Sequence, residues 1–164
     1  MDETEATLHQ HYMRLALKQA ERALEAGEIP VGAIIVYDNR IVGKAHNQCE
    51  MLHDPTAHAE MIAITQAAEA LSADRPKHRG SLEGATMYVT LEPCPMCAGA
   101  LVWTKCTNLV FGSLDLKAGA CQTLYRITQD ERLNHRLVVT GGVLAEESRS
   151  LLQAFFKSLR KEKR

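Results

Sequence analysis

The sequence predicts a three-layer α/β/α sandwich, in which helices pack on both faces of a five-stranded mixed sheet. Segments with helical periodicity alternate along the chain with short runs rich in β-branched residues, which is the pattern of an α/β fold. The 164 residues, 46% of them hydrophobic, suffice for one sizeable core and leave little room for a second. Neither an internal repeat nor a linker interrupts the pattern. We therefore expect residues 1–164 to form one domain.

The first part of the sequence predicts a helix followed by a β-hairpin. Across residues 4–25, apolar side chains recur every three or four positions, as on one face of a helix. Gly27 stands where a C-cap is expected, and Pro30 prevents the helix from resuming. Residues 31–37 form an apolar run typical of a buried strand, and residues 41–43 return after a polar turn as its hairpin partner.

The middle of the sequence predicts two helices on either side of a strand. Residues 47–56 are polar, and we expect them to be irregular. Two apolar stripes over residues 57–71 predict a helix that is buried on more than one side. After a polar loop, residues 86–91 predict a strand, and Pro93 opens a helix expected over residues 94–104.

The last part predicts two short strands and an amphipathic helix. Residues 109–112 and 136–140 have the composition of strands. The final helix presents apolar side chains on one face: Leu144, Leu151, Leu152, Phe155 and Leu159. Acidic residues at its start and basic residues at its end complement the helix dipole.

The overall charge argues against a uniformly basic nucleic-acid-binding protein. The 19 lysines and arginines nearly balance the 20 aspartates and glutamates, so the formal net charge is −1. The segment 157–164 nevertheless holds five basic residues and one acidic residue. Two interpretations stay open: these cations stabilise the end of the helix, or they meet the phosphates of an RNA.

Cysteine content and the N-terminal residues bear on the compartment. Five cysteines, an odd number, argue against a closed disulfide framework. The acidic start lacks the basic and apolar regions of a secretory signal, and no apolar run approaches the roughly 18 residues of a membrane span. We expect a protein of the reducing cytoplasm that does not enter membranes.

Two short motifs carry the chemistry: His58-Ala59-Glu60 and the segment 93–97, Pro-Cys-Pro-Met-Cys, each at the start of a predicted helix. Cys94 and Cys97 are three residues apart and can bind one ion from the same helix face. A position in the first turn favours thiolates, and His58 completes a zinc ligand set that leaves a fourth position for water. Zinc lowers the pKa of such a water to roughly 7. We expect one zinc ion per chain.

Glu60 is the candidate catalytic residue. Side chains in a first turn tilt toward the helix N-terminus, so both His58 and Glu60 can reach past the helix end. A carboxylate there can take a proton from zinc-bound water and return it to a ring nitrogen and a leaving amine. This set of groups suits hydrolytic deamination.

Two other interpretations use the same motifs without deamination. A structural zinc site would take its fourth ligand from Cys49, Cys106 or Cys121. A redox-active dithiol would use only the two cysteines of segment 93–97 and would leave the histidine motif without a role.

The motifs H-x-E and P-C-x-x-C resemble the signature of the zinc-dependent nucleoside and nucleobase deaminases. Further segments are similar, in the same order, to the branch of that family that acts on transfer RNA: residues 29–33, 53–60, 88–94, 96–100, 110–112 and 134–136. The resemblance implies a cytidine deaminase-like fold and conversion of adenosine to inosine at the wobble position of a tRNA anticodon. It implies His58, Cys94 and Cys97 as zinc ligands. Glu60 would be the proton shuttle.

The resemblance also implies contacts with the substrate and a partner. Asn47 matches a residue that hydrogen-bonds the purine, and Asp115 matches an acidic residue in a loop that contacts neighbouring nucleotides. Phe156 and Lys157 lie where the last helix of the family approaches the anticodon loop. From the residues alone, loop capping is the alternative role of Asn47 and Asp115, and core packing is that of Phe156. A homodimer is expected from the resemblance only.

Two departures from the pattern concern the substrate. Trp103, in the second zinc helix, is more similar to the guanine deaminase branch, and Leu114 stands where a longer polar or basic residue is common. Deamination of guanine as a free base is therefore the alternative enzymatic activity. A nucleic-acid-binding module with a structural zinc ion and no turnover is the alternative from another class of protein.

Overall fold

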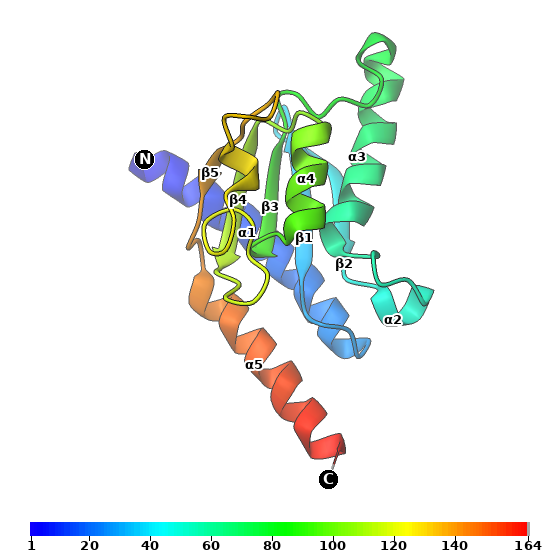
Figure 1. The fold of residues 1–164 in the computed structure, drawn as a ribbon, viewed down its shortest axis with the longest axis vertical. Helices are drawn as coiled ribbons and strands as arrows, with labels where there is room; N and C mark the ends of the chain where they lie inside the picture. Colours follow the sequence, from blue (N-terminus) through cyan, green and yellow to red (C-terminus); the bar gives the residue numbers. More distant parts are fainter. Residues whose placement is uncertain (164) are drawn as a thin grey trace.

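A computed structural model describes residues 1–163 and contains one five-stranded sheet (Figure 1). The strands are β1 Gly32–Tyr37, β2 Arg40–His46, β3 Thr86–Leu91, β4 Asn108–Ser113 and β5 Val138–Thr140. Their order across the sheet is β2-β1-β3-β4-β5. β1 is antiparallel to both its neighbours, whereas β3, β4 and β5 run parallel to one another. The predicted mixed sheet is confirmed.

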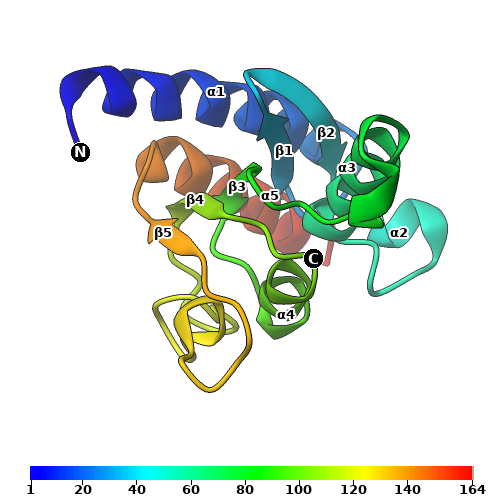
Figure 2. The ribbon, with the colours of Figure 1, turned by 90° about the horizontal axis from the view of Figure 1, so that it is seen from above.

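Helices cover both faces of this sheet (Figure 2). α1 (Glu3–Glu25) and α5 (Ala145–Glu162) pack on one face, while α3 (Ala59–Asp74) and α4 (Pro95–Trp103) pack on the other. A separate apolar cluster fills each interface, and the larger one lies under α3 and α4. The predicted α/β/α sandwich is therefore confirmed. Among the helices of residues 1–163, none combines the length and apolar composition that crossing a membrane requires.

The contact between α1 and β1 depends on a glycine. Asp2 caps α1 by accepting a hydrogen bond from the Glu5 N–H at 2.8 Å, and the chain leaves the helix through Gly27 at a φ of 75°. A Cβ atom on Gly32 would lie 2.1 Å from the backbone oxygen of Ala16. The helix can lie this close to the sheet only because residue 32 has no side chain.

The segment expected to be irregular contains a short helix, α2 (Cys49–Leu52). The backbone amides at its N-terminus donate hydrogen bonds to a side chain that lies more than twenty residues earlier in the chain. The buried carboxylate of Glu28 accepts hydrogen bonds from the backbone N–H groups of Glu50 and Met51, at 2.8 and 2.9 Å. A cap supplied from another part of the chain leaves no signal in the local sequence, so the expectation of an irregular segment was wrong.

Other element boundaries differ by a few residues from those expected. β2 continues to His46, because it pairs with β1 as far as Gly32, whereas β5 is confined to Val138–Thr140. α3 extends to Asp74, and two 3₁₀ turns, η1 (Pro76–His78) and η2 (Ile127–Gln129), lie in loops. α3 and α4 begin just after His58 and Cys94, which are N-cap residues and not helical ones.

Candidate metal centre and its cavity

The N-termini of α3 and α4 bring the histidine and cysteine motifs together. His58 is the N-cap residue of α3 and Cys94 that of α4, yet neither side chain makes a capping hydrogen bond. His58 Nδ1 lies 3.6 Å from Cys94 Sγ and 3.5 Å from Cys97 Sγ. The three ligand atoms all lie within 4.8 Å of one another.

These distances fit a zinc ion. In a tetrahedral site with usual Zn–S and Zn–N bond lengths, sulfur and nitrogen ligands lie about 3.6 Å apart. Within residues 1–163 no other group of three metal-ligating side chains is found, and Cys49, Cys106 and Cys121 do not join this one. The structural site with a fourth cysteine ligand, considered above, is therefore absent from this part of the chain. Three protein ligands leave a coordination position for water.

The protonation of the cluster also suits a cation. A hydrogen bond from the Cys97 thiol lowers the pKa of Cys94 to about 4, and the same contact raises the pKa of Cys97. The hydrogen bond with Cys94 raises the pKa of His58. The thiol proton of Cys97 and the imidazole of His58 thus lie beside a Cys94 sulfur that favours the thiolate form. A divalent ion takes the place of such protons when it binds thiolates and a neutral histidine.

Glu60 lies beside the ligands without being one of them. It occupies the first turn of α3 and is only 4% exposed. Burial raises the pKa of its carboxyl group. A buried carboxyl group with a raised pKa is the kind of group that serves as a general acid and base.

A cavity of about 430 Å³ opens in front of this cluster. It is lined by the segments that precede β1 and α2, the end of β3, the starts of α3 and α4, the loop after β4 and one face of α5. Six of the eight predicted site residues line it: Asn47, His58, Glu60, Cys94, Asp115 and Phe156. Cys97 is fully buried, and Lys157 is exposed on α5 without lining the cavity.

Asn47 and Asp115 cap their loops and also line the cavity. Asn47 donates from Nδ2 to the Ile29 carbonyl at 3.3 Å, and its Oδ1 accepts from the Cys49 thiol at 3.0 Å. Asp115 accepts at Oδ1 from the amides of Lys117 and Ala118, at 2.9 and 3.1 Å. Both residues therefore cap a loop and form part of the cavity wall at the same time.

Phe156 is not a core residue, because 43% of it is exposed at the edge of the cavity. It also lines a second hollow of about 410 Å³, which shares Lys117, Leu152 and Phe156 with the first. We call this hollow the basic groove after its four cations: Lys117, Arg149, Arg160 and Lys163. Arg149 is paired with Glu146.

The basic groove was missed in the sequence, although a signal for it existed. Arg149, Gln153, Phe156, Arg160 and Lys163 recur at helical spacing and so share one face of α5. The sequence pattern had indicated only one group of cations, from residue 157 onward. Of that group, Arg164 lies outside the described residues.

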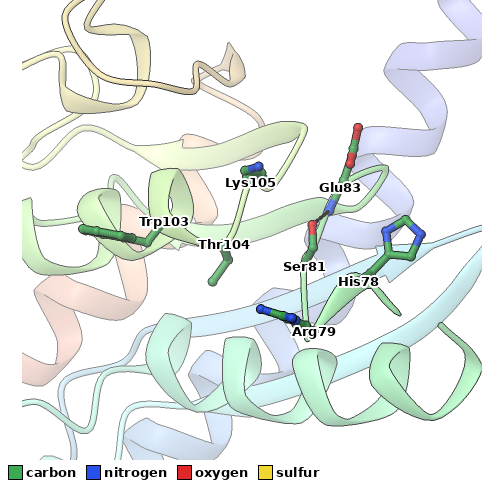
Figure 3. Close-up of a pocket in the computed structure, with 8 residues that line it drawn as sticks. His78, Arg79, Ser81, Glu83, Trp103, Thr104 and Lys105 are labelled. Carbon is green, nitrogen blue, oxygen red and sulfur yellow. Dashed lines mark hydrogen bonds between the residues drawn. The ribbon is translucent and has the colours of Figure 1, made fainter. Parts of the chain in front are cut away.

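Trp103 lies far from this chemistry. It stands at the C-terminal end of α4, whereas the metal ligands stand at the N-terminal end. Its side chain is 85% exposed beside a separate hollow lined also by Arg79 and Lys105 (Figure 3). None of the predicted site residues lines that hollow. The tryptophan therefore gives no information on what the cavity binds.

A metal-ligand cluster at two helix N-termini, with a buried carboxyl group in the adjoining cavity, defines a metal-dependent hydrolytic enzyme. Residues 6–113 match the family described as the cytidine and deoxycytidylate deaminase zinc-binding region, and the chain belongs to that family. It is a zinc-dependent deaminase.

Curated relatives and solved structures agree with this membership. The chain is 48% identical over 153 residues to a tRNA-specific adenosine deaminase of Bacillus subtilis, covering 93% of this chain and 91% of the relative. It is 46% identical over 151 residues to the protein of that name from Aquifex aeolicus, covering 92% and 95%. A structure from a study of A-to-I editing by tRNA:A34 deaminases has a TM-score of 0.79 at 39% identity, covering 87% of this chain and 99% of that one. A guanine deaminase from Nitrosomonas europaea has a TM-score of 0.72 at 20% identity over 89% and 83%, which reflects the shared fold.

Proposed function

We propose that this enzyme converts adenosine to inosine at the wobble position of a tRNA anticodon, in the cytoplasm. The observation that carries the proposal is the cavity itself: Glu60 beside the metal ligands at its base, and the basic groove adjoining its mouth. A free base needs only the cavity, whereas a polynucleotide also needs contacts for its phosphates. Relatives named tRNA-specific adenosine deaminase match over nearly their whole length and support this choice.

In the proposed reaction, His58, Cys94 and Cys97 hold the zinc ion. When bound, zinc supplies a water molecule acidified to a pKa of roughly 7. Glu60 takes a proton from the attacking water as its oxygen bonds to C6 of the purine, and passes it to the ring nitrogen N1. The remaining proton of that oxygen then passes through Glu60 to the amino group at C6. The C6–N bond breaks, ammonia leaves, and the oxygen becomes the C6 carbonyl of inosine.

The other residues of the cavity position the substrate. We assign Asn47 to the purine, because its amide is buried and lies in the cavity wall. Asp115 and Phe156 stand at the outer part of the cavity and are assigned to nucleotides next to the target base. Arg160 and Lys163 are better placed than Lys157 for phosphates, since both line the basic groove.

The test is ammonia release from an anticodon stem-loop with adenosine at the wobble position, with free guanine as the competing substrate. A matched stem-loop that carries guanosine at the wobble position is the control. We expect one inosine per adenosine stem-loop, and no ammonia from the control or from guanine. Release from guanine alone would replace the proposal with the guanine deaminase function. Release from neither, with the stem-loop still bound, would leave a nucleic-acid-binding module with a structural zinc ion.

We also propose that the enzyme is a homodimer, joined through the outer face of α4. Met96, Gly99 and Trp103 follow one another on this face at helical spacing, and an added Cβ on Gly99 would meet no atom within 4 Å. Gly99→Glu should therefore leave the fold of the subunit intact but separate the subunits. Light scattering should give twice the subunit mass for the parent and the subunit mass for the variant. A monomeric parent would contradict the proposal.

A further inference from the structure

The loop between β4 and η2, residues 114–126, forms one wall of the cavity and is organised around a buried carboxylate. Glu92, at the end of β3, is only 1% exposed. Its Oε2 accepts hydrogen bonds from the amides of Cys121, Gln122 and Thr123, at 3.1, 2.8 and 3.0 Å. Its Oε1 accepts from the Asp115 amide at 3.1 Å and from the Thr123 hydroxyl. Both ends of the loop are thus bonded to the same side chain.

The loop also packs closely against the Glu92 carboxylate. A Cβ atom on Gly119 would lie 2.4 Å from Glu92 Oε1 and 2.6 Å from the Asp115 carbonyl oxygen. The loop can close around the carboxylate only because residue 119 is a glycine. Ala120 adds a backbone hydrogen bond to the Pro93 carbonyl at 2.9 Å, so the loop follows the segment that leads from β3 to the metal ligands.

We infer that Glu92 is a positioning residue for substrate binding. It sets the place of Asp115, which lines the cavity, and of Lys117, which lines both the cavity and the basic groove. Glu92 itself borders the cavity, but five hydrogen bonds from the loop occupy both oxygens of its carboxylate, so it acts on the substrate through Asp115 and Lys117. This role rests on the proposed function, in which Asp115 contacts a nucleotide next to the target base and Lys117 contacts a phosphate.

Glutamine at position 92 is a selective perturbation. An amide oxygen in the place of Oε2 can still accept from the three amides of residues 121–123. The amide nitrogen then stands in the place of Oε1, where the Thr123 hydroxyl can turn to accept from it. The Asp115 N–H, however, faces another donor and loses its acceptor. Glu92→Gln should therefore loosen the Asp115 end of the loop most.

A matched control exists at the start of α2. Glu28 is likewise buried and likewise accepts from two backbone amides, those of Glu50 and Met51 at the start of α2. Glu28→Gln makes the same chemical change in a carboxylate that does not contact the 114–126 loop. Glu92→Gln should therefore loosen the 114–126 loop and not the start of α2, and Glu28→Gln should loosen the start of α2 and not the loop.

Amide hydrogen exchange followed by NMR tests the positioning directly and needs no substrate. In Glu92→Gln we expect the Asp115 amide to exchange at least about tenfold faster, while the amides of Glu50 and Met51 keep their rates. In Glu28→Gln we expect faster exchange at one of the two amides, Glu50 or Met51, namely the one that faces the new amide nitrogen, while the Asp115 amide keeps its rate. Unchanged exchange at Asp115 in Glu92→Gln would overturn the inference. If that variant does not fold, Thr123→Val, which removes only the hydroxyl hydrogen bond, should give a smaller acceleration in the same loop.

Kinetics with the anticodon stem-loop test the functional consequence. We expect Glu92→Gln to raise KM about 10-fold to 100-fold with kcat changed less than about threefold and zinc content unchanged. Faster exchange with an unchanged KM would show that the loop has no part in binding, and a fall in kcat with loss of zinc would show a role in the metal site; each overturns the inference. If the parent enzyme deaminates no stem-loop, the proposed function fails, while the exchange experiment still decides whether Glu92 holds the loop.

Discussion

A charge-matched pair of double variants on α5 separates specific phosphate contacts from general attraction. Arg160→Ala with Lys163→Ala removes two cations that line the basic groove. Lys157→Ala with Lys161→Ala removes the same charge from the same helix, at positions that line neither hollow. A difference in RNA binding between the two variants would therefore result from the face of the helix that carries the cations and not from its net charge.

The expected salt dependence of RNA binding follows from the number of cations in the groove. Arg149 is paired with Glu146, which leaves Lys117, Arg160 and Lys163 for phosphates. Each neutralised phosphate of a single strand contributes about 0.7 to the slope of log affinity against log salt, so the parent slope should be about 2.1. Raising the salt from about 50 to 200 mM should then weaken binding about 18-fold in the parent and about 2.6-fold in the groove variant.

The assay is a fluorescence anisotropy titration of a labelled anticodon stem-loop at several salt concentrations. The groove variant should bind more weakly at low salt and show a slope near 0.7, whereas the control should keep a slope near 2.1. Equal slopes in the two variants would refute the assignment of phosphates to the groove. A reduced slope in the control alone would assign the phosphate contacts to Lys157 and Lys161.

Three further predictions concern the metal, the acid–base group and the fold. Cys97→Ser removes one of the three zinc ligands, so elemental analysis should find well below one zinc ion per chain. Zinc retained at one ion per chain would contradict the ligand set. Glu60→Ala should retain zinc and thermal stability but lose about 10²–10⁴-fold in rate, and deamination at the parental rate would exclude the proton shuttle. Gly32→Ala should destabilise the protein by about 1–3 kcal/mol in chemical denaturation, because its Cβ would overlap the Ala16 carbonyl oxygen. A variant as stable as the parent would contradict the packing of α1 on β1.

The sequence by itself determined the elements and the chemistry that is local to them. Helical periodicity located α1, and the strand runs located β1, β3 and β4, because hydrophobic burial on one face imposes a period on the chain. The metal site was equally accessible, since Cys94 and Cys97 lie within one helical turn and His58 and Glu60 lie in another. Residue type and spacing within a turn are sufficient to name a ligand set.

Only the tertiary structure decided what surrounds that site. Glu28 and Glu92 appear in the sequence as ordinary charged residues, yet each is buried and accepts backbone amides from a segment more than twenty residues away. The basic groove combines Lys117 from a loop with Arg160 and Lys163 from α5, and the phase of that helix separates them from Lys157. The physical reason is the same in each case: these contacts join parts of the chain distant in sequence, and only packing against the sheet fixes which side chains face each other.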